Sequence, residues 1–171
     1  MRRPSRVRRP GRPRAARYRP AVPRLLFVHH TVSPALHDCF LAALEGASDP
    51  AITGVEVVHR AALSAGPLDV LGADGYLLGA PVNLGYLAGA VKHFFDTIYY
   101  PCLEETRGRP FGVYLHGNND LAGGLRAIST ITTGLGWRSA QAPVEILGAP
   151  GPDDRAACRE LGAGMAAGLM A

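Results

Sequence analysis

The chain has 171 residues, enough for one domain with a sizeable core, and 47% of them are apolar. Its formal net charge of +4 hides two oppositely charged parts: residues 1–24 hold ten of the 18 Lys and Arg and none of the 14 Asp and Glu, so residues 25–171 carry a net charge of −6. No apolar run approaches the roughly 18 residues of a membrane-spanning helix, which argues against an integral helical membrane protein.

Residues 1–23 form an Arg- and Pro-rich tail that we expect to be disordered, because it buries too little apolar surface to offset its ordering entropy. Its arginines suit contact with nucleic acid or a membrane surface. Arg2 and Arg3 are similar to the start of a twin-arginine export signal, but no apolar segment follows them. The interpretation we favour is an extension without function, with the folded domain over residues 24–171.

Short apolar segments alternate with helical patterns after the tail. Strands are expected at residues 25–29, 54–59, 75–79, 110–115 and 142–147. Helices are expected from Pro34 to Gly46, over 87–99, over 121–133, and from a cap at Asp153 to about Met170, with a short helix or irregular link at 67–71.

This alternation predicts an α/β fold with a parallel sheet covered by helices on both faces. Five strands in a chain of this size favour a flavodoxin-like doubly wound sheet in the order 2-1-3-4-5. In such sheets a ligand binds beyond the carboxyl ends of the strands, at the switch point between the first and third strands. That rule selects the loops at residues 29–35, 79–87 and 116–124.

The first loop has the features of an anion site. Ser33 is a good N-cap and Pro34 a good first helical residue. The amides that open this helix, together with the hydroxyls of Thr31 and Ser33, suit a phosphate group. The alternative is an ordinary capped helix that needs no ligand, and on this loop alone we favour it. Neither GxGxxG nor GxxxxGK[ST] is present, so a dinucleotide fingerprint or P-loop is not indicated.

The second loop, GAPVNLGY, is richer in special residues than a simple connection requires. Gly79 and Gly85 permit close backbone approach and unusual φ angles, and Pro81 restricts the residue before it. Asn83 can bond a ligand or its own backbone, and Tyr86 offers a flat apolar face. A tight turn with a helix cap explains part of this string but leaves the rest unexplained.

The third loop, HGNNDLAGG, follows the fourth expected strand and supplies exposed amides and side-chain donors. Within it, Asp120 is expected to cap the next helix. The convergence of three polar, glycine-rich loops on one sheet edge is what a bound cofactor requires.

The stretches DGYLLGAPVNLGYLAGAVKHFFD, RPFGVYLHGNNDLAGG and ITTGLGW resemble the flavodoxin-like flavoproteins, in particular the NAD(P)H-dependent FMN reductase and WrbA-like quinone reductase group. The resemblance covers residues 24–150 and rests most on the G-x-P-x-N-x-G-Y loop and the helix with K-x-F-F-D. The first loop departs from the family's S-x-T-G-N-T pattern, because it carries two histidines and a proline and lacks the Gly-Asn-Thr segment.

The resemblance implies an FMN cofactor held by the three loops. It implies that the phosphate lies at His30, Thr31 and Ser33. It also implies that the isoalloxazine ring and ribityl chain lie along the second loop and the polar edge of the ring along the third, which involves Pro81, Val82, Asn83, Leu84, Gly85, Tyr86, His116, Gly117, Asn118 and Asn119.

The implied activity is transfer of hydride or electrons from NAD(P)H through the flavin to a small acceptor such as a quinone or free flavin. No protein acid, base or nucleophile is expected to be catalytic. The alternative is a non-enzymatic flavodoxin-type electron carrier or flavin-binding module, but the nearly neutral loops lack the acidic face expected of a carrier. The family tends to be oligomeric, so a homo-oligomer is expected.

Two other features bear on cofactors and location. His29, His30 and His116 stand at strand ends, but adjacent strand residues point to opposite faces, so a metal site is not favoured. Cys39, Cys102 and Cys158 are widely spaced without a CxxC pair, which argues against a disulfide framework and favours a reducing, cytoplasmic location.

Overall fold

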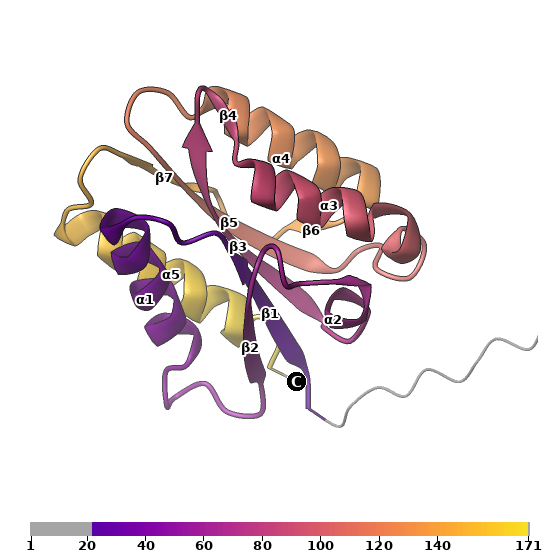
Figure 1. The fold of residues 1–171 in the computed structure, drawn as a ribbon. Helices are drawn as coiled ribbons and strands as arrows, with labels where there is room; N and C mark the ends of the chain where they lie inside the picture. The colour runs from indigo at the N-terminus through magenta and orange to yellow at the C-terminus, as the bar shows by residue number, and fades with distance from the viewer. Residues whose placement is uncertain (1–21, 171) are drawn as a thin grey trace, which may run out of the picture.

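A parallel sheet stands at the centre of the computed structural model, with helices on both faces (Figure 1). The model describes residues 22–170, so the predictions made for residues 1–21 lie outside it. The strands are β1 (Arg24–His29), β2 (Glu56–Ala61), β3 (Gly75–Asn83), β4 (Tyr86–Leu87), β5 (Pro110–Gly117), β6 (Arg138–Ser139) and β7 (Val144–Leu147). The helices are α1 (Pro34–Ala47), α2 (Pro67–Leu71), α3 (Gly89–Cys102), α4 (Ala122–Leu135) and α5 (Pro152–Ala167).

The strand order is β2-β1-β3-β5, with β6 and β7 both pairing with the free side of β5. All of these pairs are parallel. The predicted order 2-1-3-4-5 is therefore confirmed, with the fifth position shared by two short strands. The carboxyl ends of β1, β3, β5 and β7 consequently meet at one edge of the molecule.

Each face of the sheet has its own core, because the central strands are apolar on both sides. Leu25, Phe27 and Tyr114 face α1 and α5, while Leu26 and Tyr76 face the layer of α2, α3 and α4 (Figure 1). Residues 25–28 are at most 1% exposed, as expected for a strand covered twice. None of the helices in residues 22–170 is long and apolar enough to cross a membrane.

The main difference from the sequence-based expectation lies after the third strand. β3 runs on to Asn83 and folds back as β4, so residues 79–83 are strand and Leu87 is not helical. Helix α3 begins at Gly89, two residues later than predicted, because the antiparallel pairing of Asn83 with Tyr86 and of Val82 with Leu87 uses the preceding residues.

Two smaller predictions are also corrected. The last helix has Gly151 as its N-cap, and the carboxylate of Asp154 accepts its N–H at 2.7 Å, so Asp153 is not the cap. The fifth strand begins at Val144, and β6 was not predicted because two residues carry no periodicity that a pattern can detect.

The outer edge at β2 is exposed and charged. Arg24 of β1 bonds Glu56 of β2 at 2.7 Å, and Arg60 of β2 lies 3.4 Å from Asp69 of α2. These side chains border a strand whose other side has no partner among the described residues.

Candidate functional site

A cavity of about 390 Å³ opens at the carboxyl ends of the strands, where the switch-point rule predicts a ligand. Its volume falls within the roughly 300–1,000 Å³ of small-molecule sites. The loops after β1, β5 and β7 and the end of β3 all contribute to it, through Val32, Ser33, Pro34, Ala35, Leu36, Pro81, Val82, Asn83, His116, Gly117, Asn118, Gly148 and Ala149.

The loop between β1 and α1 leaves three consecutive amides free. Ser33 caps the helix as predicted, since its Oγ accepts the N–H of Leu36 at 3.2 Å, and Pro34 has no N–H. The N–H groups of Thr31, Val32 and Ser33 donate no hydrogen bond within the described residues. Free amides in succession at the positive end of a 14-residue helix form an anion-binding arrangement.

The second loop is a two-residue hairpin turn. Leu84 and Gly85 have φ angles of 54° and 74°, the positive values that a type I′ turn requires at both central positions. Asn83 and Tyr86 flank the turn as a pair, and the side chain of Leu84 is fully exposed. A leucine in the left-handed region lowers the stability of the fold, and the exposed side chain of Leu84 makes no buried contact that would offset this cost.

Most glycines of these loops serve packing inside the protein. A Cβ at Gly123 would overlap the carbonyl oxygen of Gly85, and one at Gly124 would overlap Val82. Gly79 likewise gives room to the ring of Tyr114. The first turn of α4 therefore packs directly on the hairpin. The expectation that Gly79 lets a ligand approach is wrong, because the ring of Tyr114 fills the space beside it. Gly85 is needed for its φ angle, since nothing lies within 4 Å of its Cβ position.

The third loop is held in place by hydrogen bonds of its own. His116 is 8% exposed and its Nε2 lies 2.8 Å from the carbonyl oxygen of Gly148, which ties the ends of β5 and β7 together. Asp120 accepts the N–H of Ala122 at 2.9 Å, but the N-cap residue of α4 is Leu121, so Asp120 is not the cap that was predicted. Gly117 and Gly124 are buried, so they do not supply exposed amides as expected.

The cavity brings together about half of the predicted cofactor-binding residues. Ser33, Pro81, Val82, Asn83, His116, Gly117 and Asn118 line it, whereas His30, Thr31, Leu84, Gly85, Tyr86 and Asn119 do not. Sequence reasoning missed Val32, Pro34, Ala35 and Leu36 on α1 and its loop, and Gly148 and Ala149 after β7. The strand-end rule applied to the fifth strand would have found the last two.

The histidines at the strand ends do not form a metal site. His29 points to the α1 side, where its Nδ1 lies 2.9 Å from Thr31 Oγ1 and its ring centroid 4.2 Å from that of Phe40. Burial, followed by the nearby His59 and His30, lowers the pKa of His29 to about 4. Within residues 22–170, no group of three or more His, Cys, Asp or Glu side chains is arranged to hold a metal ion.

The doubly wound sheet and the cavity at its switch point define the flavodoxin-like fold. Similar solved structures include a flavodoxin from the domain Archaea, with a TM-score of 0.72 and 15% identity over 85% of this chain and 98% of that one. A flavodoxin-like WrbA-like protein from Agrobacterium tumefaciens has a TM-score of 0.68 and 16% identity over 84% and 95% of the two chains.

A third similar structure is a longer protein. Rubredoxin oxygen:oxidoreductase from Desulfovibrio gigas has a TM-score of 0.72 and 13% identity over 87% of this chain but 37% of its own. No protein-family model and no curated protein matches the sequence. At these identities the likeness establishes the fold.

Proposed function

We propose that this protein binds FMN in the cavity at the switch point and uses it as an NAD(P)H-dependent oxidoreductase. The observation that carries the proposal is the set of free amides at Thr31, Val32 and Ser33 just before α1, because Val32 and Ser33 line the same cavity as Asn83 and Asn118. An anion-binding end and an amide-bearing end are what a nucleotide with one phosphate requires.

The residues present fit this cofactor, with fewer helix amides available at the phosphate end than an uncapped helix would offer. Pro34 and the Ser33 cap remove two of the helix amides from use, so the phosphate must rely on the loop amides and the N–H of Ala35. Pro81 and Val82 provide an apolar wall, and the side chains of Asn83 and Asn118 are exposed and free to bond a polar ring edge.

Bound FMN would supply the hydride and electron chemistry. The contribution of the chain is to bind and orient the ring through Asn83, Asn118 and backbone amides, which also stabilise negative charge that develops along the ring edge. The hydrogen bond between His116 and Gly148 holds the two strand ends that face this edge at a set spacing.

The neutrality of the cavity supports an enzyme over an electron carrier. None of the described residues that line it is Asp, Glu, Lys or Arg, so it lacks the charged surface that steers a carrier to a protein partner. A small acceptor such as a quinone or free flavin needs no such surface. We include in the proposal that the protein works as a homo-oligomer in the cytoplasm.

FMN titration followed by flavin fluorescence tests the cofactor. We expect FMN to bind more tightly than riboflavin, and Asn83→Ala to weaken both. Ala35→Asp adds a negative charge beside the free amides and should weaken FMN at least about tenfold, equal to about 1.4 kcal/mol, with a smaller effect on riboflavin. The matched control is Ala122→Asp, at the exposed start of α4. No binding of either flavin by the folded wild-type protein would refute the proposal.

Steady-state consumption of NADPH or NADH tests the activity. We expect the FMN-loaded protein to oxidise one of them continuously in the presence of a quinone. A flavin-loaded protein that exchanges electrons only with a reductase protein would instead be a carrier, and this outcome would refute the enzymatic part while leaving the cofactor assignment intact.

A further inference from the structure

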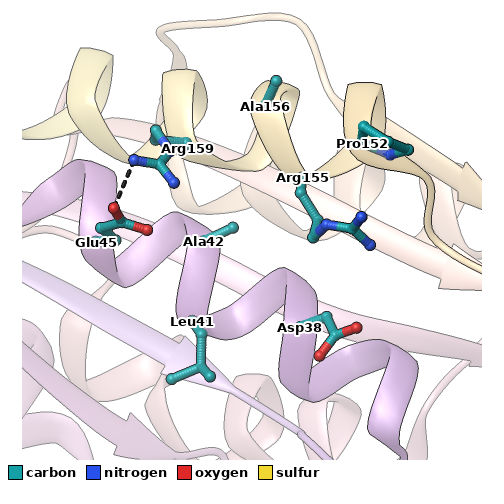
Figure 2. Close-up of a pocket in the computed structure, with 8 residues that line it drawn as sticks. All are labelled: Asp38, Leu41, Ala42, Glu45, Pro152, Arg155, Ala156 and Arg159. Atoms are coloured by element: carbon teal, nitrogen blue, oxygen red, sulfur yellow. Dashed lines mark hydrogen bonds and ion pairs between the residues drawn. The ribbon is translucent and has the colours of Figure 1, made fainter.

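A second cavity lies outside the proposed flavin site, between the outer surfaces of α1 and α5. Its volume is about 520 Å³, and it forms a groove along the two helices, which run side by side (Figure 2). The two helices make the most extensive helix–helix contact in the described structure, since Gly46 of α1 lies against the backbone of Arg159 and Gly162 of α5 against that of Ala43. The groove is therefore a rigid surface feature.

The two sides of the groove carry opposite charges. Asp38 and Glu45 stand on α1, and Arg155 and Arg159 stand on α5 (Figure 2). Glu45 and Arg159 are paired at 2.5 Å, but their side chains remain 59% and 55% exposed. Within residues 22–170, the guanidinium of Arg155 bonds only the carbonyl oxygen of Pro150, at 2.9 Å, and Asp38 has no ion pair. Among the charged residues that line the groove, those of α1 are therefore acidic and those of α5 basic, although α5 also carries the exposed Asp153 and Glu160 outside the lining.

An exposed leucine accompanies the charges. Leu41 is 48% exposed and is the one large apolar side chain exposed on the described parts of α1 and α5. Leu41 points away from α5, on the outer side of α1. Ala156 points away from α1, on the outer side of α5 (Figure 2). If a two-fold axis placed α1 of one copy on α5 of another, Leu41 would therefore meet a small residue, Ala156.

We propose that a second copy of this chain docks on the groove about a two-fold axis parallel to α1 and α5. Such an axis places the α1 of each copy on the α5 of its partner and keeps positions along the groove in register. The acidic side of one copy then meets the basic side of the other, and Leu41 approaches Ala156. The contact is isologous, so each favourable pair occurs twice.

The charge pattern selects this axis over the alternative. A two-fold axis across the groove would place α1 on α1 and α5 on α5, so that acids face acids and arginines face arginines, which costs free energy. Under the proposed axis, Asp38 gains Arg155 of the second copy as its ion-pair partner. The proposal concerns a different surface from the cavity at the strand ends and does not depend on FMN.

Sedimentation velocity of the full-length protein over a concentration series tests the proposal. We expect a monomer–dimer equilibrium that weakens with added salt. Asp38→Arg and Arg155→Asp should each raise the Kd at least about tenfold by placing like charges together, and the double variant should restore dimerisation because the pair is re-formed with exchanged signs. Glu104→Arg is the control, since Glu104 is 74% exposed and lies outside the groove.

Leu41→Glu provides a second measurement and should also dissociate the dimer. Leu41 is exposed in the monomer, so a charged side chain at this position is compatible with the fold. Circular dichroism establishes that each variant is folded. A wild-type protein that stays monomeric, or a dimer insensitive to the charge reversals, would overturn the proposal. A dimer that the single reversals break and the double variant does not restore would overturn the proposed axis.

Discussion

The ring of Tyr114 on β5 lies across Gly79 on β3, and its hydroxyl occupies the place where a side chain at position 79 would begin. Gly79→Ala should therefore destabilise the protein by about 1–3 kcal/mol, because the buried ring must move within a packed core. Urea denaturation measures the change. Gly89→Ala is the control: it opens α3, has no atom within 4 Å of its Cβ position, and should be neutral or slightly stabilising. Equal stability of Gly79→Ala and wild type would contradict this account.

The two fully buried tyrosines should respond differently to loss of their hydroxyls. The hydroxyl of Tyr114 lies near Thr31 but makes no hydrogen bond of ordinary geometry, whereas that of Tyr76 donates to Val70 O at 2.9 Å and accepts from Arg109 at 3.0 Å. Tyr114→Phe should leave the free energy of unfolding unchanged or raise it, while Tyr76→Phe should lower it by about 1 kcal/mol or more. A larger loss for Tyr114→Phe would reveal a partner for its hydroxyl.

Leu84 combines a positive φ of 54° with full exposure at the tip of the hairpin. Leu84→Asn creates the Asn-Gly turn that this geometry prefers, so we expect a gain in stability of about 1 kcal/mol by thermal denaturation. Gly85→Ala is the comparison variant and should lower the stability of the protein, because a φ of 74° is unfavourable for alanine. If Leu84 contacts bound FMN, Leu84→Asn will also weaken flavin binding, which would explain why a strained leucine stands there.

The low pKa of His29 predicts a loss of stability in acid. Burial, then His59 and His30, lower the pKa from its usual 6.5 to about 4. Between these values the unfolded chain holds the proton and the folded one does not, so stability is full above pH 6.5 and falls as the pH drops toward 4. His29→Phe should flatten this part of the profile, measured as unfolding midpoints from pH 7 to about 4.5. His93→Phe, at an exposed position on α3, is the matched control for the same change of side chain.

The sheet could be predicted because each central strand is an apolar run short enough to exclude a helix. Residues 25–28 and 76–78 are buried on both sides, and this double burial is visible as uninterrupted hydrophobicity. The order of strands then followed from general rules of connection. The hairpin could not be predicted, because Leu-Gly is not a typical turn sequence and Leu87 continues the helical spacing of α3.

The sequence predicted where the cavity lies, but only about half of the residues that were expected to line it do so. The strand-end rule selected loops that line the cavity, but the roles of Gly79 and Gly123 depend on contacts with Tyr114 and Gly85 that are distant in sequence. A glycine that admits a ligand and one that admits a neighbouring segment have the same sequence signature. Only the three-dimensional structure separates them.

The division of the last strand position into β6 and β7 affects how the molecules can meet in solution. Pieces of two and four residues are too short to template a foreign strand, and the opposite edge at β2 carries Glu56 and Arg60 in ion pairs. Both edges of the sheet are thus protected against adding strands from another chain. Association between copies is left to the helical faces, where side chains rather than backbone decide which partner fits.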